Sequence, residues 1–130
     1  MKAYWDSSAV IEACSSQVLR ARLHRERGFT RTHTLAEVFS TLTGGNLAFR
    51  LDADAAAQTV DNLAADLDFQ DLTAIEILKA MTNARKKGVR GGRIHDFLHA
   101  VAAQKSGAKV LLTLDKNDFN DPTSVEIEQV

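Results

Sequence analysis

The sequence predicts an α/β fold, a three-layer α/β/α sandwich with a central, mainly parallel sheet, and two observations support this prediction. Short apolar runs alternate with longer segments of helical periodicity along the chain. Strands that alternate with helices are typical of β-α-β units, whose strands lie parallel. The run at 109–114, KVLLTL, is the clearest strand and has the character of one that is buried inside a sheet.

The composition predicts one globular domain that spans residues 1–130 and has its own hydrophobic core. The formal net charge of −1 provides no general basic field, so an anionic partner would need a local basic patch or a metal ion. Cys14 is the only cysteine, which excludes an internal disulfide and fits a reducing compartment. No apolar run approaches the ~18–20 residues of a membrane span, and no signal peptide is evident, so we expect a cytoplasmic location.

The strand candidates are short, and most are bounded by an acidic residue, a threonine or a glycine. They lie at 1–6, 29–33, 69–72, 109–114 and 124–128. The run at 29–33 is weakly marked, whereas the last one alternates plainly between apolar and polar residues.

Helical patterns fill the intervals between these strands. They lie at 7–13, 17–27, 34–42, 73–87 and 93–106, and a further helix, the fourth in order, follows residue 52 or 54 and carries an apolar stripe from 56 to 67. Hydroxyl and acidic side chains are expected at their beginnings: Ser7 or Ser8 for the first helix, and Asp52 or Asp54 for the fourth. Gly28 is expected to end the second helix.

Five acidic residues lie where the predicted strands end or the predicted helices begin. They are Asp6, Glu37, Asp96, Asp115 and Asp118. In open parallel sheets, ligands bind beyond the carboxyl ends of the strands, and Asp6 and Asp115 directly follow such ends. Because Mg²⁺ and Mn²⁺ prefer oxygen ligands, we expect the five carboxylates to converge on one metal site.

Several of these acids also have a simpler interpretation as helix caps. Asp6 could cap the helix that follows it, and Thr34-Leu-Ala-Glu37 matches the T-x-x-E capping box, which favours capping for Glu37 when it is taken alone. One acid of the pair Asp115 and Asp118 could cap a helical turn. Convergence of all five by accident is the less economical explanation.

The surroundings of Asp96 point more directly to a buried partner. An apolar stripe runs along one side of its predicted helix, and Asp96 lies roughly opposite it, beside the small residues Ala100 and Ala103. A helix with these two sides is expected to be buried on both. An unpaired buried carboxylate is very costly, so a metal ion is a good candidate for its partner.

In their order and spacing these motifs resemble those of the PIN-domain ribonucleases, particularly the small toxins of the VapC kind. The opening strand with Asp6 and the letters SSAVI is similar to the first acidic motif of that family, and Glu37 is similar to the second. Asp96, followed by FLHAVAA, resembles the third, although Phe97 stands where the family usually has an alanine. Residues 107–119, GAKVLLTLDKNDF, resemble the family's strand, threonine and closing acid–Phe pair.

The resemblance implies a Mg²⁺- or Mn²⁺-dependent enzyme that hydrolyses RNA phosphodiester bonds and leaves a 5′-phosphate and a 3′-hydroxyl. The implied catalytic acids are Asp6, Glu37, Asp96 and Asp115. The implied ligands of one or two metal ions are Asp6, Asp96 and Asp115, with Asp118 as a ligand or as a group that holds water. Ser7 and Thr113 would orient these carboxylates. Carboxylates packed together without metal repel one another, so raised pKa values are expected in the site.

The resemblance also implies partners: a cognate antitoxin protein whose peptide covers the acidic site, and a second copy in a homodimer. The basic segment at 85–93 leads into Asp96, so Arg90 and Arg93 are candidate contacts to RNA phosphates. A solvated helix end explains the same basic residues equally well.

Two other functions remain open from the sequence. A PIN-like module that has lost catalysis could bind RNA or a protein, although all the acids are present. His95 and His99 have the i, i+4 spacing of a zinc-binding helix, but no third ligand is evident downstream, so surface histidines are the better interpretation.

Overall fold

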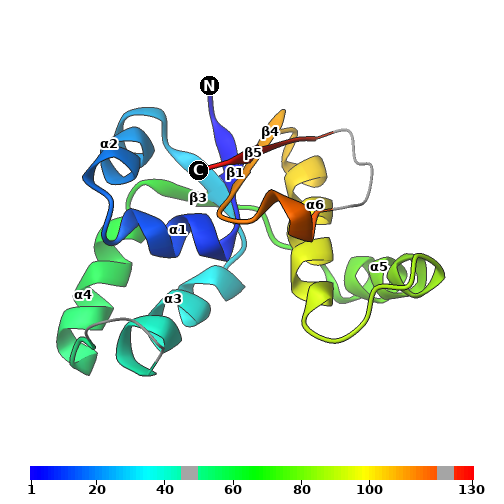
Figure 1. Cartoon of the computed structure of the whole chain (residues 1–130), viewed down its shortest axis with the longest axis horizontal. Coiled ribbons are helices and arrows are strands. Elements are labelled where there is room, and N and C mark those ends of the chain that lie inside the picture. The colour runs from blue at the N-terminus through cyan, green and yellow to red at the C-terminus, as the bar shows by residue number, and fades with distance from the viewer. Residues whose placement is uncertain (45–49, 120–124) are drawn as a thin grey trace.

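A five-stranded sheet lies between two groups of helices in the computed structural model (Figure 1), which describes residues 1–44, 50–119 and 125–130. The strands are β1 (Ala3–Trp5), β2 (Gly28–Thr30), β3 (Leu67–Phe69), β4 (Val110–Thr113) and β5 (Glu126–Gln129). Their order in the sheet is β3-β2-β1-β4-β5, and all four pairings are parallel. The prediction of a mainly parallel sheet is confirmed.

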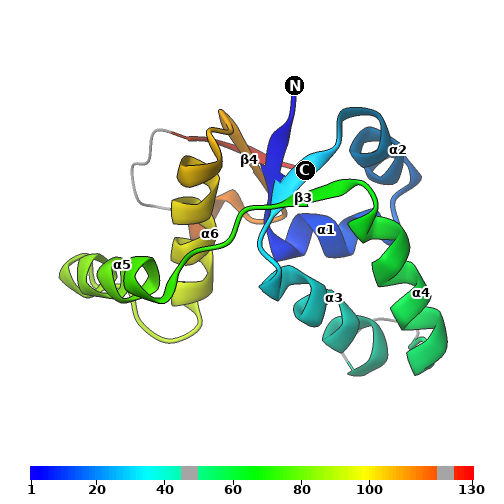
Figure 2. The same cartoon turned by 180° about the vertical axis from the view of Figure 1, so that it is seen from behind.

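Six helices and one short 3₁₀ turn accompany the strands in the described residues. They are α1 (Ser7–Ala13), α2 (Gln17–Glu26), α3 (His33–Gly44), α4 (Ala53–Ala64), α5 (Ala74–Lys86), α6 (Arg93–Ser106) and η1 (Lys116–Asp118). Helices α1 to α4 lie on one side of the sheet, and α6 lies on the other with α5 packed against it (Figures 1 and 2). This arrangement confirms the three-layer sandwich.

Alternation along the central strands divides the core into two parts. Ala3 and Trp5 of β1 face the cluster built with α1 to α4, whereas Tyr4 between them faces the cluster on the α6 side. On α6 the buried contacts are made by Ala102 and Ala103, which are fully buried. These small side chains allow the helix backbone to approach the sheet closely.

The structure corrects the expected ends of three elements. Gly28 does not end α2; Arg27, at φ 59°, follows that helix, and Gly28 begins β2. A Cβ at Gly28 would lie 2.6 Å from Cδ1 of Trp5, so a glycine is needed there for close packing. Strand β3 lies at Leu67–Phe69, earlier than the predicted 69–72, because α4 ends at Ala64. The last strand is β5 at Glu126–Gln129, and residue 124 of the predicted run lies outside the described residues.

Two expected helix caps are also corrected. Asp6, and not Ser7 or Ser8, caps α1, since its side chain accepts a hydrogen bond from the N–H of Ala9. The capping box expected for Thr34 and Glu37 is not among the contacts of the described residues. The Thr34 hydroxyl instead bonds with Thr30 Oγ1 at 2.8 Å. The capping box of Thr73 and Glu76 at the start of α5 does form.

The chain order creates a switch point between β1 and β4. From β1 the chain adds β2 and then β3 on one side, and later adds β4 on the other side. The N–H of Asp6 donates to the carbonyl of Leu112 at 3.1 Å, so the carboxyl ends of β1 and β4 lie together. Ligands bind at such a point in open parallel sheets. Among the described helices, none is long and apolar enough to cross a membrane.

Candidate active site

An acidic hollow of about 240 Å³ lies at this carboxyl edge of the sheet. Its walls come from α1, α3, α6 and the exit of β4. The lining residues are Asp6, Ser7, Ser8, Ile11, Glu37, His95, Asp96, His99, Leu114 and Asp115. Four of the five predicted acids therefore line the same hollow. The side chain of Asp118 lies outside the described residues, and its role stays a prediction.

Asp6 is the most deeply buried of these acids, with 3% of its surface exposed. Its Oδ1 accepts hydrogen bonds from the N–H of Ala9 at 2.9 Å and from the hydroxyl of Ser8 at 2.6 Å. Burial raises the pKa of the Asp6 carboxyl above its ordinary value, against the lowering effect of these hydrogen bonds. The expected rise in pKa is thus found at Asp6, and its largest cause is burial.

The hydroxyl groups that hold this edge together are those of Ser8 and Thr113. Ser8 Oγ donates to Asp6, accepts from the N–H of Leu114 at 3.0 Å and lies 3.3 Å from Thr113 Oγ1. Thr113 Oγ1 accepts from the N–H of Asp115 at 3.3 Å. The sequence predicted such a role for Thr113, whereas Ser8 was expected only as a possible helix cap. Ser8 stands two residues after Asp6, the acid that caps α1, and this spacing could have indicated its contact with that carboxylate.

Ser7 belongs to a buried network of hydrogen bonds beside the hollow. Its hydroxyl lies 3.0 Å from His99 Nε2 and 3.3 Å from Thr34 Oγ1, while the hydroxyl of Tyr4 lies 2.7 Å from His99 Nδ1. Thr34 in turn bonds with Thr30. The network therefore joins β1, β2, α1, α3 and α6. Within the described residues, none of these contacts of Ser7 is with a carboxylate, so its predicted role in orienting one stays a prediction.

His99 is the residue that connects this network, and sequence analysis could not assign its role. Burial lowers its pKa to about 3, and electrostatic interactions with Arg31, His33 and His95 lower it further. The imidazole is therefore neutral at physiological pH and offers one donor and one acceptor nitrogen. Both nitrogens have partners in the protein. This arrangement argues against the zinc alternative, in which His99 would be a ligand.

Glu37 projects from α3 with one oxygen to which the described residues donate no hydrogen bond. Its Oε1 is buried and accepts no hydrogen bond from the described residues. His33 Nε2 lies 3.3 Å from this atom, close enough for an ion pair but at an angle that makes no hydrogen bond. The ring of His33 stacks on the ring of His95 with centroids 5.6 Å apart, which links the starts of α3 and α6.

Asp96 and Asp115 complete the acidic wall, Asp96 from α6 and Asp115 from the exit of β4. Asp96 is half-buried in the first turn of α6. Asp115 is exposed after β4, and its Oδ1 accepts from the N–H of Asn117 at 3.0 Å, so it caps η1 as one of the predicted pair was expected to do. The exposed side chains of Arg90 and Arg93 do not line the hollow, and their contact with substrate stays a prediction.

The donor set of the hollow fits a hard divalent cation. Among the described residues, four carboxylates and no lysine or arginine line it, and one carboxylate oxygen is buried without a hydrogen bond. In the described part of the chain, however, no three His, Cys, Asp or Glu side chains are gathered closely enough to hold an ion together.

Fold and site together define an α/β protein with an acidic centre at the switch point of a parallel sheet. Residues 3–123 match the family model of the PIN domain. The chain therefore belongs to the PIN domain family, whose members are nucleases that generally depend on divalent metal ions. The protein is accordingly a PIN-domain nuclease.

Two solved structures share this fold at low sequence identity. PAE2754 from Pyrobaculum aerophilum is 18% identical, with a TM-score of 0.73 over 98% of this chain and 89% of that chain. VapBC2 from Rickettsia felis, bound to a DNA fragment from its promoter, is 16% identical, with a TM-score of 0.72 over 100% of this chain and 99% of that chain. No curated protein matches the chain in sequence.

Proposed function

We propose that this protein is a Mg²⁺- or Mn²⁺-dependent ribonuclease that hydrolyses RNA phosphodiester bonds. The observation that carries the proposal is the convergence of Asp6, Glu37, Asp96 and Asp115, from four separate segments, on one hollow at the sheet's switch point. Membership in the PIN domain family supports the nuclease activity.

The chain's own residues divide the work of hydrolysis. A divalent ion held by these carboxylates would supply charge neutralisation at the phosphate and a lowered pKa for water at the site. Ser8 and the N–H of Ala9 hold the Asp6 carboxylate toward that position. Asp96 and Asp115 contribute oxygen donors from the other walls. Glu37 has an unsatisfied Oε1 that can accept a hydrogen bond from the attacking water.

The biological role that we propose is the toxin of a type II toxin–antitoxin pair, held inactive by a cognate antitoxin. Its support is the fold shared with VapBC2 over almost the whole of both chains. A homodimer belongs to the same proposal. Exposed apolar side chains on α5, which are Ile75, Leu78 and Met81, provide surface for such contacts.

The test of the nuclease proposal is cleavage of labelled single-stranded RNA by purified protein that has been freed of any partner. We expect cleavage with Mg²⁺ or Mn²⁺, none with EDTA, and a loss of about a hundredfold or more in Asp96→Asn. Asp61→Asn, an exposed acid on α4, is the matched control and should cleave as the wild type does. A wild type that cleaves no RNA with either metal, or cleaves equally in EDTA, contradicts the proposal.

A catalytically inactive binding module is the second candidate function. The observation that favours it is the spacing of the acids, since no three of the described metal-ligating side chains are gathered in one shell. For such a module, the same assay would show no cleavage under any metal condition. A separate binding measurement would still detect RNA or a protein partner.

A further inference from the structure

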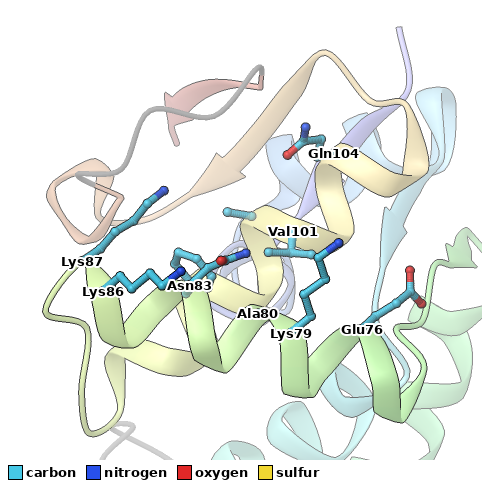
Figure 3. Close-up of a pocket in the computed structure, with 10 residues that line it drawn as sticks. Glu76, Lys79, Ala80, Asn83, Lys86, Lys87, Val101 and Gln104 are labelled. Carbon is cyan, nitrogen blue, oxygen red and sulfur yellow. The ribbon is translucent and has the colours of Figure 1, made fainter.

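A second and larger hollow, of about 530 Å³, lies between α5 and α6 (Figure 3). Three lysines line it, and Figure 3 shows Lys79 and Lys86 of α5, and Lys87 directly after it, extending along its rim. Lys79 and Lys86 form no ion pair with any described residue. The hollow is therefore a groove with a basic rim, which we call the lysine groove.

The positive charge of the lysine groove is a local feature of a chain that has a net charge of −1. Residues 77–95 contain no Asp or Glu and six of the 16 lysines and arginines. The acid in the groove wall is Glu76, which is engaged by Lys105 Nζ at 2.6 Å and by the N–H of Thr73 at 2.8 Å. A local excess of cations of this kind selects an anionic ligand.

The floor of the lysine groove is apolar and includes an aromatic ring. Phe97, Ala100 and Val101 of α6 form it, and Lys87 Nζ lies 5.8 Å from the centroid of the Phe97 ring. Basic rims that follow a backbone, combined with aromatic rings against which bases stack, are typical of sites for single-stranded nucleic acid. The large exposed apolar side chains of α5, by contrast, do not line the groove.

Helix α6 forms a wall of both hollows. Its residues His95, Asp96 and His99 line the acidic hollow, whereas Phe97 and Val101 line the lysine groove. These two sets point to opposite sides of a helix whose diameter with side chains is about 10–12 Å. A strand that crosses α6 could therefore occupy both hollows with a few nucleotides between them.

We propose that the lysine groove binds the sugar–phosphate backbone of the RNA that flanks the scissile bond. This proposal rests on the proposed ribonuclease function and extends it to the substrate. Lys79, Lys86 and Lys87 contact phosphates, and the Phe97 side of the floor receives a base. The enzyme consequently prefers an extended RNA strand to a short oligonucleotide that reaches only the acidic hollow.

The test is RNA binding by the full chain in an Asp96→Asn background, which separates binding from cleavage. Fluorescence anisotropy would compare a labelled strand of about 16 nucleotides with one of about 4, lengths that bracket common single-strand site sizes. The double variant Lys79→Gln/Lys86→Gln should bind the long strand about tenfold more weakly. The slope of log K against log salt should fall in magnitude by about 1.4, or about 0.7 for each phosphate contact. The short strand should bind unchanged.

Lys109→Gln, which removes an exposed lysine outside the lysine groove, is the matched control and should leave both affinities and the salt slope unchanged. A double variant that binds the long strand with unaltered affinity and salt slope overturns the proposal. So does a double variant that binds RNA normally but loses an acidic protein partner, because the groove then serves that partner.

Cleavage by the parent protein, assayed separately, distinguishes the two proposals. If the wild type cleaves RNA and the lysine variants cleave the long strand with unchanged KM, the groove proposal fails and the ribonuclease stands. If the wild type cleaves nothing while the lysine variants lose affinity for the long strand, the ribonuclease fails and the groove still binds RNA.

Discussion

The carboxylate of Asp6 performs two tasks at one position. It caps α1 by accepting the N–H of Ala9, and it forms part of the acidic wall. An asparagine at this position keeps a carbonyl oxygen for the cap but removes the negative charge, whereas an alanine removes both. Substitution at Asp6 can therefore separate the structural contribution of this side chain from the chemical one.

For Asp6→Asn we predict a free energy of unfolding close to that of the wild type, together with loss of RNA cleavage. For Asp6→Ala we predict the same loss of cleavage and a stability lower by about 1 kcal/mol, because the cap is lost. Urea unfolding and the cleavage assay measure the two effects. Equal stability losses in both variants would show that the cap contributes nothing.

Ser7 and Ser8 are adjacent, but their hydroxyl groups have different partners. Ser8→Ala removes the hydrogen bond to Asp6 Oδ1, so we predict a fall of about tenfold or more in cleavage rate with little change in stability. Ser7→Ala leaves His99 Nε2 without its partner, so we predict a stability loss of about 1–2 kcal/mol. Identical effects of the two substitutions on both measurements would contradict these assignments.

The buried imidazole of His99 should make stability depend on pH. Its pKa is about 3 in the folded chain and about 6.5 when unfolded, so below pH ~6.5 the unfolded chain takes up a proton that the folded chain does not. The stability that His99 contributes is thus complete above pH ~6.5 and is lost as the pH falls toward 3.

We test this dependence by the difference in unfolding free energy between wild type and His99→Gln. The difference should fall by at most ~1.4 kcal/mol for each pH unit below about 6.5. The raised pKa of Asp6 acts in the opposite direction, but Asp6 is present in both proteins, so its effect largely cancels. A difference that stays constant between pH ~7 and ~5 would contradict a neutral, buried His99.

At the scale of elements, the contact between β1 and β2 depends on a missing side chain. A Cβ on Gly28 would lie 2.6 Å from Cδ1 of the buried Trp5, so we predict that Gly28→Ala destabilises the protein by about 1–3 kcal/mol. Gly44→Ala at the end of α3, where a Cβ meets nothing within 4 Å, is the control and should be neutral or slightly stabilising. Thermal unfolding would show the contrast, and equal melting temperatures would refute it.

The two capping-box patterns show what local sequence can and cannot predict. Thr73 and Glu76 form the box because they lie on an exposed helix start, where only local contacts compete. Thr34 and Glu37 have the same letters, but Thr34 is fully buried and bonds with Thr30, and Glu37 faces the acidic hollow. The difference is tertiary, and a window of four residues contains no information about it.

At the scale of the whole molecule, the sheet order brings together acids that are far apart in sequence. Asp6 and Asp115 could be placed at one edge from the sequence because each directly follows a recognisable strand. Ser8 and His99 could not, since their roles depend on which side chains α1 and α6 present to each other. The lysine groove likewise requires the packing of α5 on α6, which no local pattern specifies.

The central claim is that carboxylates from four segments act together on one divalent ion, and direct titration with Mn²⁺ tests it most simply. Calorimetry on the wild type should show saturable binding of Mn²⁺. Asp96→Asn should weaken that binding by about tenfold or more, and Asp61→Asn should leave it unchanged. A wild type that binds no Mn²⁺, or an Asp96→Asn variant that binds it as tightly as the wild type, would contradict the account.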